Sequence, residues 1–194
     1  MSDRPALRVI WLKRDLRLRD HAPIAEALRM GGPHLLLYCF EPLDLAHPTT
    51  SGRHVGFVQQ GLADMDGQLQ QWHCEGAIRA GVGTTPLHAD ALEVFRHLLR
   101  EVDLLGVHSY RESGLKHTYD RDRALAKMLK DAGVPWHEHQ RDGVHRGKRD
   151  RHQWRESWFA HMSAPQDHPD WPRFDPVDPA QLKWPEGWRS LPVP

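Results

Sequence analysis

Residues 8–20 read RVIWLKRDLRLRD and place a charged loop directly after a short apolar run. The run is rich in β-branched and large apolar side chains, which predicts a buried strand. The loop that follows carries four basic and two acidic side chains. Guanidinium groups suit phosphate or carboxylate ligands, and we expect Asp15 to orient Arg14 and Arg17 through ion pairs. From this chemistry alone the loop is either a ligand-binding segment or a structural network of arginine and aspartate.

The same alternation of apolar strand and helical segment continues downstream. Strands are predicted at residues 8–12, 35–40, 77–82, 104–109 and 136–139. The helix after the second strand is the clearest, because its apolar positions from Val55 to Trp72 are spaced by three and four residues. We expect Asp20, Thr85-Pro86 and Thr118 to begin the other three helices between strands.

Strands that alternate with helices pair in parallel, because each helix returns the chain to the same end of the sheet. The sequence therefore predicts an α/β fold over residues 1–140: a doubly wound, Rossmann-like sheet of five parallel strands with helices on both faces. Such a fold binds ligands beyond the carboxyl ends of its strands. The expected loops follow Leu12, Phe40, Gly83 and Ser109.

Two further segments complete the predicted organisation. Residues 141–162 form a basic segment and a helix. Between Arg141 and Arg155, two acidic side chains accompany six basic ones, which are Arg141, Arg146, Lys148, Arg149, Arg151 and Arg155. This stretch would contact DNA phosphates weakly, or form a solvated surface, or face another domain. Residues 163–194 hold eight prolines and three tryptophans, a composition that predicts an extended connector packed on its own domain, a partner or a second domain.

Composition excludes several classes of protein. The 194 residues hold 26 basic and 26 acidic side chains, which argues against a nonspecific nucleic-acid coat protein. Cys39 and Cys74 lack the spacing of a disulfide scaffold or a cysteine-based zinc site. The longest apolar run is far too short to cross a membrane, and the N-terminus lacks a signal-peptide pattern. We therefore expect a cytoplasmic protein.

Fifteen histidines raise the question of metal binding. His137 and His139 share one face of the last predicted strand, and His145 and His152 follow nearby. No HExxH motif or paired Cys/His spacing accompanies them, so the sequence predicts no metal site.

Several ordered segments closely resemble the photolyase/cryptochrome family. They are VIWLKRDLRLRDHAPIAEAL at 9–28 and the segments 38–42, 53–57, 112–114, 119–124 and 143–154. Together they cover about residues 7–162. The resemblance implies an α/β domain that often carries an antenna chromophore, and a separate helical domain that holds FAD and splits pyrimidine dimers in light. Nothing in this sequence resembles the FAD domain, so we expect a truncated, non-catalytic half, with FAD bound only if that domain is supplied.

The resemblance also implies where an antenna would bind. The matching positions are Arg14, Asp15, Leu16, Arg17, Phe40, Glu41 and Arg53. Folate-binding members commonly carry a glutamate where this chain has Thr118, so a flavin or deazaflavin is expected in preference to a folate.

The expected function is therefore light-dependent DNA repair or blue-light sensing, with this chain as the antenna or structural half. Expected partners are the FAD-binding helical domain or a second copy docked through the Pro/Trp-rich tail. The alternative is a stand-alone module that binds a nucleotide-like ligand or another protein without photochemistry.

Overall fold

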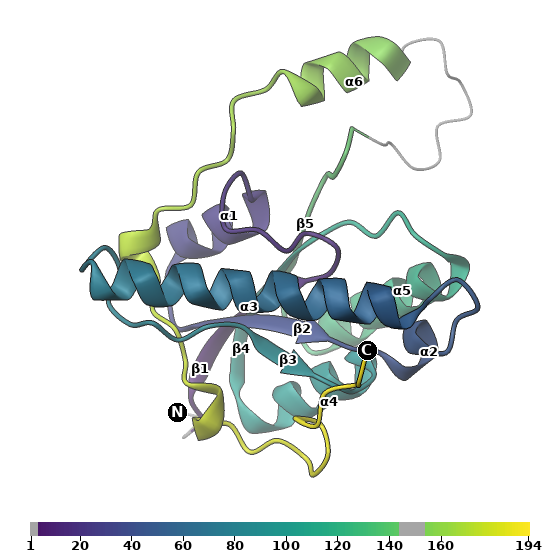
Figure 1. Cartoon of the computed structure of the whole chain (residues 1–194), viewed down its shortest axis with the longest axis horizontal. Helices are drawn as coiled ribbons and strands as arrows, with labels where there is room; N and C mark the ends of the chain where they lie inside the picture. The colour runs from purple at the N-terminus through teal and green to yellow at the C-terminus, as the bar shows by residue number, and fades with distance from the viewer. Residues whose placement is uncertain (1–3, 144–153) are drawn as a thin grey trace.

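The computed structural model describes residues 4–143 and 154–194 and is built around a five-stranded sheet (Figure 1). The strands are β1 (Ala6–Leu12), β2 (His34–Cys39), β3 (Thr85–Leu87), β4 (Asp103–Tyr110) and β5 (Trp136–His139). All pair in parallel in the order β3-β2-β1-β4-β5. The predicted doubly wound sheet is confirmed, and its order reverses between β1 and β4, where such sheets bind ligands.

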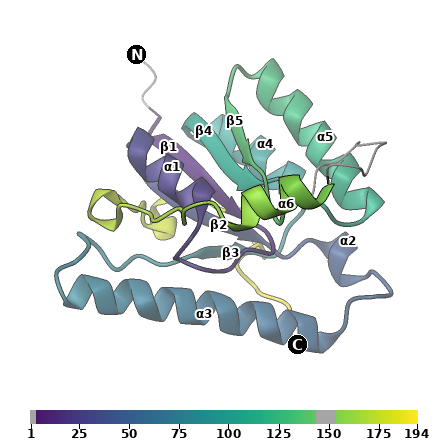
Figure 2. The same ribbon diagram turned by 90° about the horizontal axis from the view of Figure 1, so that it is seen from above.

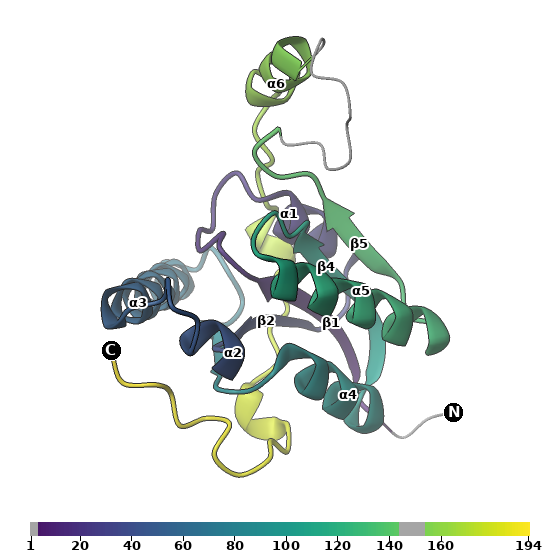
Figure 3. The ribbon, with the colours of Figure 1, turned by 90° about the vertical axis from the view of Figure 1, so that its right-hand side faces the viewer.

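Helices cover both faces of the sheet. They are α1 (Ala22–Met30), α2 (Pro42–Leu45), α3 (Gly52–Cys74), α4 (Ala91–Glu101), α5 (Lys116–Asp131) and α6 (Trp154–Met162). α1 and α3 lie over one face, and α4 and α5 lie over the other (Figure 3). Neighbouring residues of β1 point to opposite faces of the sheet. Ile10 packs under α1 and α3, whereas Trp11 contacts Phe95 of α4 edge to face, with ring centres 5.3 Å apart.

The third strand is not where the sequence predicted it. Residues 77–82 form no strand; only Ile78 among them is buried, and it anchors the loop against the core beneath α3. β3 instead contains Thr85 and its proline neighbour, so the expectation that they open a helix is wrong. Proline is tolerated there because β3 is an edge strand. The following helix begins at Ala91, capped by Asp90.

Two other predicted caps are also wrong. α1 is capped by His21, whose Nδ1 accepts the N–H of Ile24 at 3.2 Å, and Asp20 precedes it in a left-handed conformation. α5 begins at Lys116, so Thr118 lies inside the helix and its hydroxyl donates to the Leu115 carbonyl at 2.8 Å. Helix starts are usually predicted from the side-chain oxygens of Ser, Thr, Asp and Asn. A histidine ring nitrogen that caps a helix is therefore overlooked.

The Pro/Trp-rich tail packs on its own domain. Phe174 is completely buried in the layer under α1 and α3, and Leu182 is buried in the opposite layer. The backbone N–H groups of His34 and His88 donate to tail carbonyls, both at 2.7 Å. α6 stands away from the sheet (Figures 1 and 3), and in the view from above it lies in front of the strands (Figure 2). The start of the predicted helix and most of the basic stretch fall at 144–153, outside the described residues.

Among the residues described, no helix combines the length and apolar character needed to span a bilayer.

Candidate functional site

A cavity of about 60 Å³ lies at the carboxyl ends of β1 and β2, beside the point where the strand order reverses. It is lined by Trp11, Leu12, Lys13, Arg14, Tyr38, Cys39, Glu41, Asp44, Glu112 and Arg121. Loops after β1, β2 and β4 bring these side chains together, as the fold class predicts. The predicted loop after Gly83 does not contribute, because that glycine precedes β3.

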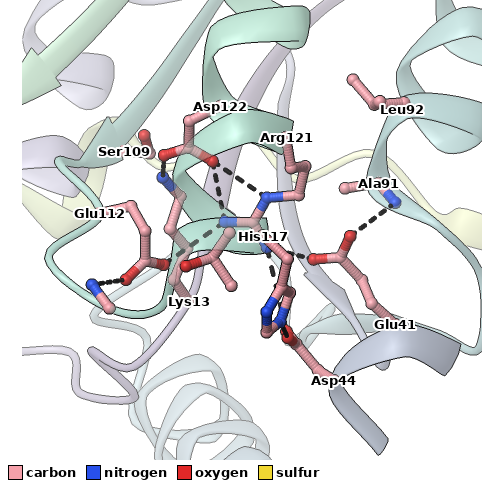
Figure 4. A network of polar contacts seen from close by, with 12 residues as sticks. Lys13, Glu41, Asp44, Ala91, Leu92, Ser109, Glu112, His117, Arg121 and Asp122 are labelled. Atoms are coloured by element: carbon pink, nitrogen blue, oxygen red, sulfur yellow. Dashed lines mark hydrogen bonds and ion pairs between the residues drawn. The ribbon is translucent and has the colours of Figure 1, made fainter. Parts of the chain in front are cut away.

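Arg121 of α5 is the centre of the polar side chains around this cavity (Figure 4). Its Nη1 pairs with Glu41, and its Nη2 lies 2.8 Å from Asp122 Oδ1 and 3.4 Å from Glu112 Oε2. The guanidinium also lies 4.8 Å from the centre of the buried Trp11 ring. We call Lys13, Glu41, Asp44, Glu112, His117, Arg121 and Asp122 the Arg121 network.

The charge of Arg121 is fully engaged by this network. Burial opposes the charge, but Glu41 and Asp122 outweigh burial and raise the pKa of Arg121. Asp44 of α2 lies 4.0 Å from Nη1 and also pairs with His117. The network therefore joins α2, α5 and the loop after β4 into one assembly.

Lys13 connects the end of β1 to the same assembly. Its Nζ lies 2.8 Å from Asp122 Oδ2, donates to the Tyr110 carbonyl at 3.1 Å and lies 4.3 Å from the Trp11 ring centre. Burial lowers the pKa of Lys13, although Asp122 opposes that effect. This lysine is therefore a structural tie and not a free cation awaiting a ligand.

Glu41 follows β2 and occupies the capping position of α2. Its Oε2 accepts the N–H of Ala91 at 3.2 Å. Burial raises the pKa of Glu41 to about 7, because removal from water outweighs the attraction of Arg121. A carboxyl group with this pKa is partly protonated near neutral pH.

Of the seven predicted antenna residues, only Arg14 and Glu41 line the cavity. Phe40 is buried behind it, with its ring edge-on to Tyr38 at 4.9 Å. Leu16 packs towards the core under α3. Arg53 is exposed at the start of α3 and is not among the lining side chains.

Asp15 does not orient the neighbouring arginines, so that prediction is wrong. It is buried, accepts the Lys13 N–H at 2.9 Å and lies 2.7 Å from His21 Nε2. Its pKa is lowered because these partners outweigh the burial that acts in the opposite direction. Arg17 instead donates to the Asp20 carbonyl at 2.7 and 3.0 Å. The aspartate thus fixes the loop onto α1, which is the structural interpretation of this segment.

Sequence reasoning missed Arg121 as the organising residue. A signal was present, because Arg121 stands four residues before the buried Leu125 and so projects from the inward side of α5. A basic side chain in that register requires acidic partners on neighbouring elements.

The family model for DNA photolyase matches residues 8–149. The chain belongs to the DNA photolyase family. It is 26% identical over 141 residues to cryptochrome DASH of Synechocystis sp., covering 69% of this chain and 27% of that protein. It is 25% identical over 126 residues to the deoxyribodipyrimidine photo-lyase of Synechococcus sp., covering 65% of this chain and 24% of that protein. The chain thus spans about a quarter of the length of these curated relatives.

Solved structures of photolyase-family proteins share the fold. A bacterial class III photolyase from Agrobacterium tumefaciens matches 97% of this chain and 37% of its own, with a TM-score of 0.64 and 21% identity. The Synechocystis cryptochrome matches 72% of this chain and 28% of its own, with a TM-score of 0.61 and 23% identity. The archaeal photolyase from Sulfolobus tokodaii, described with two FAD molecules, matches with a TM-score of 0.59 and 20% identity.

A flavin or deazaflavin does not fit the cavity in this conformation. The volume of about 60 Å³ accommodates a few water molecules, whereas ligand pockets occupy roughly 300–1,000 Å³. The lining also brings the carboxyl groups of Glu41, Asp44 and Glu112 towards any anionic tail. Arg14 is the one lining cation that is exposed, since Lys13 and Arg121 are already paired.

Proposed function

We propose that this chain forms the α/β portion of a photolyase or cryptochrome and serves light-dependent repair of pyrimidine dimers or blue-light sensing. The family match over residues 8–149 supports this assignment. The resemblance assigns the photochemistry to a flavin-binding helical portion. In this proposal the α/β chain acts as the scaffold of that helical portion. The alternative, a stand-alone binding module, receives no separate support from the relatives.

The Arg121 network is the observation that favours a scaffold over a light-harvesting role. It fills the ligand end of the sheet with paired side chains and leaves about 60 Å³. A closed polar network fixes the relative positions of the surrounding elements. In this proposal the network holds the loops after β1, β2 and β4 in place for a neighbouring domain.

The surface of α6 is proposed to meet that flavin-binding portion. Trp154, Phe159 and Met162 are exposed on this helix, and exposed apolar side chains that cluster indicate an interaction site. The tail tryptophans are already half-buried against their own domain, which favours α6 over the tail as the contact. DNA contact through the basic stretch stays a prediction, since Arg141 pairs with Asp142 at 2.9 Å and residues 144–153 are not described.

A domain exchange tests this function. The matching α/β portion of the Agrobacterium tumefaciens class III photolyase is replaced with this chain, and light-dependent repair of a dimer-containing oligonucleotide is measured. The account predicts a chimera that retains FAD and repairs the dimer in light, while a control photolyase lacking its α/β portion does not. A chimera that binds FAD normally but repairs nothing would contradict the assignment.

A further inference from the structure

Three histidines and one glutamate meet between α1 and the β4–β5 edge of the sheet, away from the Arg121 network. Glu26 Oε2 lies 2.9 Å from His139 Nε2, 3.4 Å from His108 Nδ1 and 3.7 Å from His137 Nδ1. The rings of His108 and His137 stack in parallel, with centres 4.6 Å apart. One carboxylate oxygen is therefore faced by three imidazole nitrogens.

We propose that Glu26, His108 and His139 bind a divalent transition-metal ion of the zinc class, with His137 beside them. The three ligand atoms all lie within 4.8 Å of one another. Zinc takes histidine nitrogen and carboxylate oxygen at about 2.0–2.2 Å, which puts neighbouring ligand atoms of a tetrahedral site about 3.4 Å apart. Small shifts of these side chains would therefore make room for an ion between them. Such an ion would tie α1 to both strands.

The surroundings of a buried nitrogen also support the site. The ring of His108 is completely buried, yet its Nδ1 makes no hydrogen bond to the described side chains, and Glu26 Oε2 faces it at 3.4 Å. Buried nitrogen atoms are rarely left in this state.

An ion can reach the cluster from solvent. Glu26 and His139 line an open concave surface of about 570 Å³ between α1 and the tail, together with Asp167 and His168. The remaining ring, that of His108, closes the site from the interior.

The guanidinium of Arg8 disfavours metal binding at His108, so replacing Arg8 tests the proposal. Its Nη1 lies 3.2 Å from His108 Nε2, and because a guanidinium only donates, the proton of the neutral ring sits on Nδ1. Metal binding through Nδ1 moves that proton to Nε2, where it meets the Arg8 N–H groups. Replacing Arg8 with glutamine removes the guanidinium charge and the N–H groups that face this proton, so it relieves both obstacles to metal binding.

The test uses the whole chain, freed of metal by a chelator. Zn²⁺ affinity is measured by competition with a chromogenic chelator, and Co²⁺ is followed by its visible absorption. We expect one saturable equivalent, an affinity at least about tenfold lower in Glu26→Gln and in His139→Gln, and a higher affinity in Arg8→Gln. Both ligand variants alter partly exposed side chains, and circular dichroism checks that they fold.

The matched control is the double variant His73→Gln/Cys74→Ser, which removes an exposed imidazole and an exposed thiol at the end of α3. Its affinity should equal that of the native chain. Absence of one-equivalent binding, or equal affinities in the native chain, Glu26→Gln and His139→Gln, would overturn the site. Weaker binding in an Arg8→Gln variant that circular dichroism shows to be folded would contradict ligation through His108 Nδ1.

Discussion

Glu41 shows how burial and ion pairing compete at a single residue. Arg121 and the Ala91 N–H stabilise its carboxylate, yet burial dominates and raises its pKa to about 7. The unfolded value is near 4.5. Below pH 4.5 both states are protonated, and as the pH rises towards 7 only the unfolded state loses its proton. The contribution of Glu41 to stability is therefore present below pH 4.5 and lost as the pH rises through 7.

The raised pKa of Glu41 predicts a pH-dependent loss of stability that disappears in Glu41→Gln. Between pH 4.5 and 7.5 the native chain should lose, through this residue, about 3 kcal/mol of unfolding free energy relative to the variant. Urea denaturation at several pH values measures the difference. Glu93→Gln, at an exposed position of α4, should leave the native slope unchanged, and parallel curves for the native chain and Glu41→Gln would contradict the raised pKa.

His108 gives a second prediction at the scale of one ring. Burial lowers its pKa to about 3, and His137 and Arg8 add to that effect. In the metal-free chain the ring should stay neutral as the pH falls to about 4, with its proton on Nδ1 because Arg8 donates to Nε2. Long-range ¹H–¹⁵N NMR reads both the tautomer and the titration. A midpoint near 6.5, or a proton on Nε2, would refute the buried geometry.

At the scale of elements, the long helices were predictable and the short strand was not. The three-and-four spacing from Val55 onwards extends over many turns, so α3 had no competing interpretation. β3 has three residues, too few to show the alternation of a strand. Its Thr85-Pro86 pair is also typical of the first residues of a helix. Pairing with β2, a contact distant in sequence, decides the conformation of that pair.

Two substitutions test whether Asp90 or Thr85 caps the helix α4. The Oγ1 of Thr85 is buried without a hydrogen-bond partner in the described structure, so Thr85→Val should be neutral or stabilising. Asp90 accepts the Leu92 N–H at 2.8 Å, so Asp90→Ala should cost about 1 kcal/mol. Chemical denaturation of both variants gives the answer, and the reverse order of costs would restore Thr85 as the cap.

At the scale of the whole molecule, the tail is an integral part of the fold. Phe174 fills the layer under α1 and α3, stacked on His34 at 5.9 Å and edge-on to Trp171 at 5.4 Å. Composition indicated that this segment packs on something, but not on what. The contact depends on surfaces that exist only after the sheet has formed.

Phe174→Ala should therefore destabilise the chain by about 3 kcal/mol and expose the tail to proteases. Denaturant unfolding and limited proteolysis measure the two effects. Val193→Ala, at a position that is 90% exposed, is the control that should change neither. A Phe174→Ala variant as stable and protease-resistant as the native chain would show that the tail is not docked.

The position of the candidate site at one edge of the sheet was predictable from the sequence, but most of the side chains that form it were not. Parallel strands bring the loops after β1 and β2 to one edge, which predicted the place of the site. The family resemblance then named Arg14 and Glu41 within those loops. Arg121 lies 80 residues beyond Glu41, and no local spacing indicates which acidic side chains it will meet. The contact between Asp15 and His21 could not be predicted either, because it depends on the path of the loop between them.

Because the Arg121 network fills the ligand end of the sheet, we predict that this photolyase-family domain binds no ring chromophore there. Titration of flavin mononucleotide with the purified chain, followed by flavin fluorescence, tests it most directly. The account predicts no saturable quenching. Stoichiometric quenching that is lost in Arg14→Gln would contradict it and restore the antenna role of the cavity.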